Sequence, residues 1–175
     1  PRDIKSFLEF ASGYGRVTRF ITTIIEPHNI TVADIDPCAI HFNTKTFHTK
    51  PLLSVEHPQE LSSAEQYEVI FVASLFSHLS LEYWQLWLNK LYSMLKPGGY
   101  LILSTHDENH DLPANHHDFL IEDGFWFLPI NETSGRLNAN VYGTTWVTYN
   151  WVKDISFQLL SFQLLSFQLT CCVTN

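Results

Sequence analysis

Apolar runs alternate with amphipathic segments along the first 106 residues, and this pattern predicts alternating strands and helices. Continuous apolar runs at Ile4–Phe10, Asn29–Ile35 and Tyr67–Ser74 are typical of strands buried on both faces. A short run, Lys50–Val55, and a later one, Tyr100–His106, predict two further strands. We expect Ile4–Phe10 and Tyr67–Ser74 to be the central strands, because their apolar character is the most continuous.

Helical spacing occurs between these runs. The segment 37–47 can form a helix with Pro37 in its first turn, and the polar stretch 56–66 can form at most a short one. The clearest helix is Leu81–Leu95, since Ser80 can cap it, Glu82 lies in its first turn and Lys-Pro-Gly-Gly follows it. Its expected apolar stripe is Leu81, Trp84, Leu88, Leu91 and Leu95. After the first strand, the expected packed helical face is Val17, Phe20, Ile21 and Ile24.

Strands that alternate with helices at this spacing predict an α/β fold. We expect a Rossmann-like, doubly wound and mainly parallel sheet, with helices on both faces and one or more antiparallel last strands. Beyond Asp107 the pattern loosens, with a short helix expected over 115–124 and a strand over 125–130.

The C-terminal tail repeats the pentapeptide Ser-Phe-Gln-Leu-Leu nearly three times over Ser156–Leu169. A period of five matches neither strand nor helix, although the first copy, Ser156–Leu160, can form an edge strand. We therefore expect one domain over 1–155 and a tail of uncertain structure over 156–175. Because the chain begins with Pro1 and a strand follows almost at once, we expect the N-terminal part of the domain to be missing.

Composition narrows the class of protein. The chain has 175 residues, 45% of them hydrophobic, which suits a globular domain with a sizeable core. The net charge is −8 and the basic residues are scattered, so we expect no nucleic-acid partner. Three cysteines, Cys38, Cys171 and Cys172, suit neither a disulfide framework nor a zinc site. No apolar run approaches the roughly 18 to 20 residues of a membrane span, so we expect no membrane partner and a cytoplasmic location.

The turn after the first strand carries the first candidate chemistry. Glu9 lies at the strand end, and Gly13 and Gly15 allow backbone N–H groups to approach a ligand at a helix N-terminus. Asp34, at the end of the second strand, is placed to accept hydrogen bonds from a ribose diol. The alternatives are an ordinary tight turn and a solvated strand end. A dinucleotide fingerprint lacks its third glycine here, because Thr18 occupies that position.

Four motifs in order resemble those of class I S-adenosylmethionine-dependent methyltransferases: LEFASGYGRVTRFI, VADIDPCAI, YEVIFVASLFSHL and LKPGGYLILSTH. The resemblance covers residues 4–106. The acid-x-Gly-x-Gly-x-Gly motif of that family falls on Glu9, Ala11, Gly13 and Gly15, with Ala11 in place of the first glycine. The later GFWFLP and YGTTWVT stretches are similar to a bacterial subgroup often found beside glycosyltransferases, in which a different last strand occupies the place of the repeat.

The resemblance implies S-adenosylmethionine as the cofactor and assigns its contacts. The loop from Ala11 through Ser12 to Gly15 would pack beside the methionyl part. Asp34 would bind the ribose diol, and Ile35 would lie against the adenine. Ala73 and Ser74 would line the methyl end. A partner for the adenine amino group is expected near 54–57, without an assigned residue.

The resulting prediction is a methyltransferase acting on a small molecule or sugar-type acceptor. Methyl transfer depends mainly on alignment in a dry pocket, so no catalytic triad is expected. His78 and His106 are weak candidates for a base, and for each the favoured interpretation is a structural histidine that caps a strand end. The histidines His116 and His117 lie in a loop, so we expect no metal site. Residues 125–127 can cover the acceptor or pack as a half-buried strand, whereas the aromatic residues of 84–92 are most simply core or helix surface.

Two other function classes remain open at this point. One is a catalytically inactive module that binds S-adenosylmethionine or a protein partner. The other is a nicotinamide-dependent oxidoreductase, which the missing third glycine disfavours.

Overall fold

The computed structural model describes residues 3–110, 120, 122–130 and 137–160. The chain divides into two compact units. The first unit contains residues 1–105 and 127–145, and the second contains 106–126 and 146–175.

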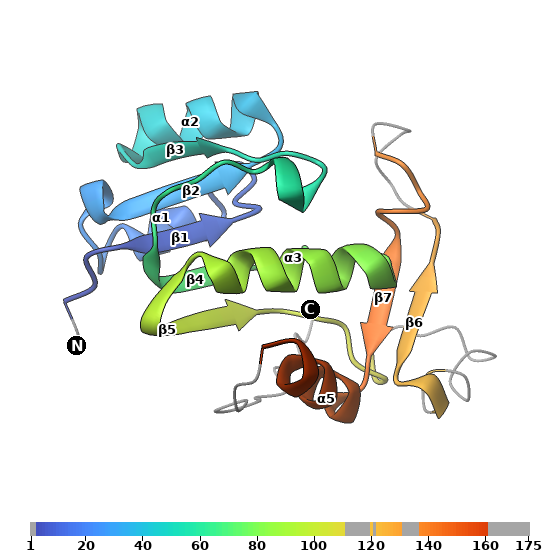
Figure 1. Cartoon of the computed structure of the whole chain (residues 1–175). Helices are drawn as coiled ribbons and strands as arrows, with labels where there is room; N and C mark the ends of the chain where they lie inside the picture. The colour runs from blue at the N-terminus through green and yellow to red at the C-terminus, as the bar shows by residue number, and fades with distance from the viewer. Residues whose placement is uncertain (1–2, 111–119, 121, 131–136, 161–175) are drawn as a thin grey trace. The chain divides into compact units, whose positions relative to one another are not determined.

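The first unit is built on a five-stranded sheet of order β3-β2-β1-β4-β5, in which the paired strands run parallel (Figure 1). The bounds are β1 Phe7–Phe10, β2 Ile30–Asp34, β3 Lys50–Leu53, β4 Tyr67–Val72 and β5 Leu95–Leu103. The predicted α/β fold is therefore confirmed. β1 and β4 are both interior strands, as their continuous apolar runs predicted.

The register brings the carboxyl ends of the strands to one edge of the sheet. Phe10 is level with Ala33 of β2 and Val72 of β4, and Asp34 is level with Leu53 of β3. From β1 the chain moves to β2 and β3, then returns to β4 on the other side of β1. This reversal creates a crevice beyond the ends of β1 and β4, where sheets of this kind bind ligands.

The helices of this unit are α1 (Thr18–Ile21), α2 (Pro37–Phe47) and α3 (Leu81–Ser93), with short 3-10 turns η1 (Pro27–Asn29) and η2 (Pro58–Glu60). α2 begins as predicted, because Pro37 occupies its first turn and the Asp36 side chain accepts a hydrogen bond from the Cys38 backbone N–H.

The predicted face of the first helix is partly wrong. α1 has a single turn, and Phe20 and Ile24 are 64% and 82% exposed. Ile21 is buried as predicted, with Thr18 and Ile25 as the other buried residues. Because the helix ends at Ile21, a regular period of 3.6 residues does not continue to Ile24.

The apolar stripe of α3 is only partly confirmed. Trp84, Leu88 and Leu91 are buried, but Leu81 is 44% exposed and Leu95 already belongs to β5. Ser80 is the N-cap residue without a side-chain capping bond.

The Lys-Pro-Gly-Gly sequence has a different role from the predicted one. It lies inside β5, where the pairing shifts from Tyr67–Leu95 to Val69–Tyr100. Gly98 has a φ of +76°, which explains why glycine suits this irregularity. The strand predicted to begin at Tyr100 therefore begins at Leu95.

The remaining elements are β6 (Phe125–Leu128), β7 (Thr144–Val147) and α5 (Tyr149–Leu160). β6 and β7 form a two-stranded antiparallel sheet (Figure 1), and the strand predicted near 125–130 is confirmed. The helix expected over 115–124 lies largely outside the described residues.

The edge strand considered for the first tail repeat is wrong, because Ser156–Leu160 forms the end of α5. Val152, Ile155 and Ser156 are buried at helical spacing, so this copy continues an amphipathic helix that begins before it. The two later copies lie outside the described residues, and the domain boundary after residue 155 stays a prediction.

Candidate functional site

A cavity of about 240 Å³ opens at the carboxyl edge of the sheet, and its walls come from the first unit. It lies at the crevice where the strand order reverses. The lining residues are Phe10, Ala11, Gly13, Asp34, Ile35, Ser54, Val55, Glu56, Ala73, Ser74, Leu75, Leu79, Tyr83, Trp87, Leu137, Val141 and Tyr142.

The loop after β1 reaches the cavity through a left-handed backbone. Ala11, Gly13 and Gly15 have φ values of +57°, +52° and +76°. Ala11 and Gly13 line the cavity. Left-handed backbone is easy for glycine and costs an alanine about 1 kcal/mol, so Ala11 occupies a position that favours the glycine of the family motif.

Asp34 fixes this loop. Its Oδ2 accepts a hydrogen bond from the Gly13 N–H at 2.7 Å, and its Oδ1 accepts one from the Asp36 N–H at 2.9 Å. Each carboxylate oxygen can accept a further bond, so Asp34 can hold the loop and a ligand hydroxyl at the same time.

Three of the residues predicted from the motif lie outside the cavity wall and support the loop. Glu9 and Ser12 are buried, and the Thr18 Oγ1 donates a hydrogen bond to Glu9 Oε2 at 2.7 Å. Gly15 is required by close approach, since a Cβ there would clash with the Asn43 side chain and come within 2.5 Å of Phe47 Cε2.

Burial changes the ionisation of Glu9. Removal of its carboxyl from water raises the pKa to about 7, although the Thr18 hydrogen bonds act in the opposite direction. Glu9 is therefore a buried group that titrates near neutral pH at the base of the loop.

Asn43 of α2 holds the same loop and was missed by the sequence analysis. Its Nδ2 donates to the Gly13 carbonyl at 2.7 Å and to the Ala39 carbonyl at 2.9 Å. The residue is fully buried. A polar residue inside a helix gives no signal in sequence that it will meet a loop 30 positions earlier.

The segment after β3 and the start of α3 form a second wall. Ser54, Val55 and Glu56 line the cavity, within the stretch where the adenine partner was expected. Tyr83 and Trp87 reach it from α3, and the Tyr83 hydroxyl hydrogen-bonds His57 Nε2 at 2.8 Å. Trp84 is buried in the core and Tyr92 is on the helix surface, as expected, whereas Trp87 is both buried and part of the cavity.

Ala73 and Ser74 line the cavity where β4 ends. Ser74 has a φ of +60°, and its N–H donates to Ser104 Oγ at 2.8 Å. This bond fixes the sharp turn that brings the chain from β4 toward α3.

Residues 137–142 complete the cavity wall and were not predicted. Leu79 and Tyr142 form an antiparallel bridge. The Ser80 N–H donates to the Val141 carbonyl at 2.9 Å, and the Gly143 N–H donates to the His78 carbonyl at 2.7 Å. This pairing holds Tyr142 at the cavity, where burial and then the charge of Asp34 raise the pKa of its hydroxyl.

His78, a candidate base, does not line the cavity but stacks on Tyr142, with ring centroids 4.9 Å apart at 20°. Its Nδ1 lies 2.8 Å from the Gly143 carbonyl, which can only accept, so Nδ1 carries the proton. In neutral His78 the acceptor nitrogen is then Nε2.

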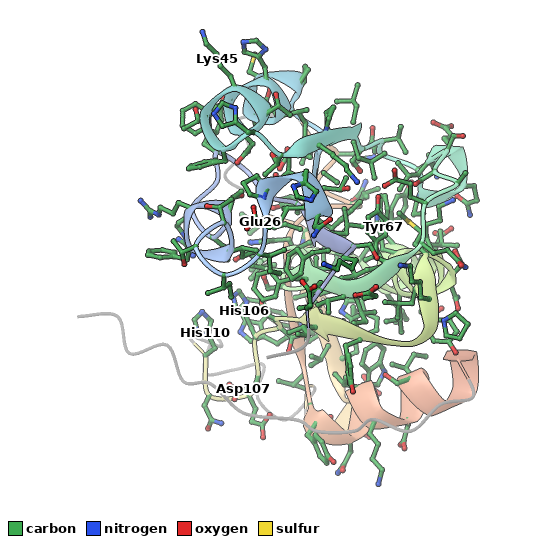
Figure 2. The ribbon with its side chains drawn as sticks, turned by 90° about the vertical axis from the view of Figure 1, so that its left-hand side faces the viewer. Glu26, Lys45, Tyr67, His106, Asp107 and His110 are labelled. Carbon is green, nitrogen blue, oxygen red and sulfur yellow. The ribbon has the colours of Figure 1, made fainter. Side chains whose placement is uncertain are left out.

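His106, the other candidate, belongs to the second unit. Figure 2 labels it with Asp107 and His110 on the segment after β5, and its ring stacks on His110 with centroids 4.1 Å apart. The backbone carbonyl of His106 accepts a hydrogen bond from the Val147 N–H, which holds the backbone of this segment. His116 and His117 lie outside the described residues. Within the described residues no three His, Cys, Asp or Glu side chains gather as metal ligands would.

β6 packs as a half-buried strand, which is one of the two alternatives predicted for residues 125–127. The residues Phe125 to Phe127 are half-buried, and Phe125 and Trp126 contact Trp151 and Trp146 with ring centroids 4.9 and 5.0 Å apart. None of them lines the cavity. A role over the acceptor stays a prediction.

Two further observations concern the surface. A second hollow of about 340 Å³, beside Asp3 and residues 22–26, lies at the amino ends of the strands, away from the edge where such sheets bind ligands. None of the helices in the described part of the chain is long and apolar enough to span a membrane.

Several solved structures have a similar fold. DhpI, in a structure described as a "DhpI-SAM-HEP complex", has a TM-score of 0.63 at 15% identity, with 88% of this chain and 69% of that chain covered. The plantazolicin methyltransferase BpumL, in complex with a desmethylPZN analog and SAH, has a TM-score of 0.60 at 15% identity, covering 90% and 56%. DesVI of Streptomyces venezuelae has a TM-score of 0.53 at 10% identity, covering 63% and 47%.

The chain spans 43%, 66% and 31% of the chains in three further matched structures, the second of which is again DhpI, described as a complex with SAH. The comparison with curated proteins gave no significant match. A family model described as "Methyltransferase domain" matches residues 8–101, which include the glycine loop, Asp34 and the end of β4. This chain therefore belongs to the methyltransferase-domain family.

Proposed function

We propose that the protein binds S-adenosylmethionine in the 240 Å³ cavity and transfers its methyl group to a small-molecule or sugar-type acceptor. The observation that carries this proposal is the hydrogen bond from the Gly13 N–H to Asp34 Oδ2, which joins the glycine loop to the acid at the sheet edge. Family membership and the methyltransferase structures of the same fold support it.

The chemistry of the lining residues supports this cofactor. Asp34 would accept hydrogen bonds from the ribose diol, and Ile35 and Val55 offer apolar surface for the adenine. Ala11 and Gly13 allow the backbone to approach the methionyl part, while Ala73 and Ser74 would line the methyl end. In the described part of the chain, no Lys, Arg or His lines the cavity, which suits a ligand that carries positive charge.

The chemistry that the cofactor supplies is a methyl group on a positively charged sulfur. The protein's contribution is to align the acceptor with that group and to exclude water, which accounts for much of the rate in such reactions. Neither candidate base, His78 or His106, lines the cavity, so no residue is assigned as a base.

The small-molecule or sugar-type acceptor is proposed from the sequence resemblance, since the cavity itself is assigned to the cofactor. The compounds named for structural relatives differ widely, from coclaurine to a desmethylPZN analog.

Two measurements test the proposal. Titration calorimetry with S-adenosylmethionine, S-adenosylhomocysteine and NAD should give binding of the first two and not of NAD; the reverse pattern would favour the oxidoreductase. Transfer of labelled methyl groups to a panel of small amines, hydroxy compounds and sugars should then identify an acceptor. Cofactor binding without transfer to any member of a broad panel would favour the inactive module.

A further inference from the structure

Residues Leu137, Val141 and Tyr142, here called the roof, bring an aromatic ring to the cavity wall. Neither the glycine loop nor any strand-end motif includes them. Tyr142 is fixed by its backbone bridge to Leu79 and by ring stacking on His78. His78 is in turn held by the Gly143 carbonyl, so the Tyr142 ring has a defined orientation rather than a free surface position.

The charged side chains that the structure describes on the cavity wall are acidic. This wall contains the carboxylates of Asp34 and Glu56 and the rings of Tyr83, Trp87 and Tyr142, and none of its described residues is Lys, Arg or His. Asp34 is close enough for its charge to raise the pKa of the Tyr142 hydroxyl. Carboxylates and aromatic faces both attract cations, and an aromatic face does so most strongly where water is excluded.

We propose that Tyr142 is a specificity-determining residue that favours the positively charged cofactor over its uncharged-sulfur product. This inference rests on the proposed function and on its assignment of the methyl end to Ala73 and Ser74, since Tyr142 is bridged to Leu79, which follows them on the same cavity wall. In methyl transfer the carbon–sulfur bond breaks as the acceptor–carbon bond forms, and the bond pair stays on sulfur. The sulfonium becomes a neutral thioether, and the acceptor proton leaves to a base or to solvent. A ring that attracts the sulfonium therefore loses that attraction when the reaction is complete, which weakens product binding relative to substrate binding.

The test compares the dissociation constants of S-adenosylmethionine and S-adenosylhomocysteine by calorimetry in three variants. Tyr142→Leu should weaken S-adenosylmethionine binding by about three- to thirtyfold relative to S-adenosylhomocysteine, since a leucine has no aromatic face. Tyr142→Phe keeps the aromatic face and should therefore keep the ratio of the two dissociation constants. Tyr100→Leu, at a partly exposed tyrosine of β5 outside the cavity wall, is the matched control and should change neither constant.

An equal loss of both ligands in Tyr142→Leu would show that Tyr142 only shapes the cavity, and would overturn the inference. If that variant does not fold, fluorinated phenylalanines at position 142 preserve the shape while weakening the ring face. The affinity ratio should then fall with each added fluorine, and a constant ratio would contradict the proposal. Failure of the unmodified protein to bind either ligand would instead reject the proposed function itself.

Discussion

Asp34 is the residue on which the loop and the proposed ligand both depend. Its two oxygens accept backbone hydrogen bonds from Gly13 and Asp36, so the carboxylate organises the site before any ligand enters. A substitution here consequently changes both the shape of the loop and the number of acceptors offered to a ribose.

We predict that Asp34→Ala weakens cofactor binding by about 1.5 to 3 kcal/mol, the usual contribution of hydrogen bonds to a charged group. Asp34→Asn keeps one oxygen acceptor and should lose less. Calorimetry with S-adenosylhomocysteine, with circular dichroism to establish folding, measures both. Unchanged affinity in a folded Asp34→Ala protein would remove this residue from the binding site.

Glu9 gives a pH dependence with a definite sign. Its pKa is about 7 in the folded protein and 4.5 in the reference state, so the folded protein binds more protons between these values. The free energy of unfolding should therefore fall as the pH rises from about 4.5 to 7, by up to about 3 kcal/mol from this group.

Glu9→Gln cannot lose a proton, and it can still accept the Thr18 hydrogen bond. Relative to the unmodified protein, its stability in urea denaturation should increase across this pH range and level off above it. Glu26→Gln, at an exposed glutamate labelled in Figure 2, is the matched control and should show no such relative gain. If the free energies of unfolding of Glu9→Gln and of the unmodified protein differ by the same amount at every pH, this account of the buried carboxyl is wrong.

Much of the cavity wall, but not all of it, could be predicted from the local sequence. Ala11, Gly13, Asp34, Ile35, Ala73 and Ser74 follow strand ends directly, and parallel strands bring those ends together. Tyr83, Trp87 and Tyr142 could not be predicted in the same way. The first two look like ordinary core residues of a helix. The position of Tyr142 depends on pairing between segments some 65 positions apart.

At the scale of elements, the strands were easier to predict than the helices. A strand buried on both faces needs only a continuous apolar run, as in β4. α1 has one turn, so its apolar residues follow the local course of the chain rather than a regular face. In β5 the shift in pairing after Tyr67 absorbs Gly98 and Gly99 into a strand, although glycines in sequence usually indicate the end of an element.

We expect the residues after α5 to be dispensable for cofactor binding. We predict that a chain ending after Leu160 binds S-adenosylhomocysteine within a few-fold of the full chain and aggregates less. The proposed cofactor contacts lie outside the repeats, and the apolar repeats favour self-association. Calorimetry and light scattering measure the two effects.

A chain ending after Thr148 is the control for this truncation. It removes α5 with its buried Val152 and Ile155, and should lose stability by several kcal/mol. If the chain ending after Leu160 unfolds as well, residues 161–175 are an integral part of the fold and the prediction for the tail is wrong.

At the scale of the whole molecule, the strand-end residues and the roof come from distant parts of the sequence. Residues up to Ser74 supply the glycine loop, the acid of β2 and the turn after β4. The roof pairs with the 78–80 segment, and 65 positions separate His78 from its hydrogen-bond partner Gly143.

This separation has a consequence for synthesis of the protein on the ribosome. At about 5 to 20 residues per second, some 3 to 13 seconds pass between the translation of His78 and that of Gly143. Once residue 101 has been made, the nascent chain carries the whole stretch that the family model matches, but it still lacks the roof. A ligand stabilises only the state that binds it. The cofactor can therefore give its full stabilisation only after the roof has been made, and until then the first half of the sheet depends more on its own packing.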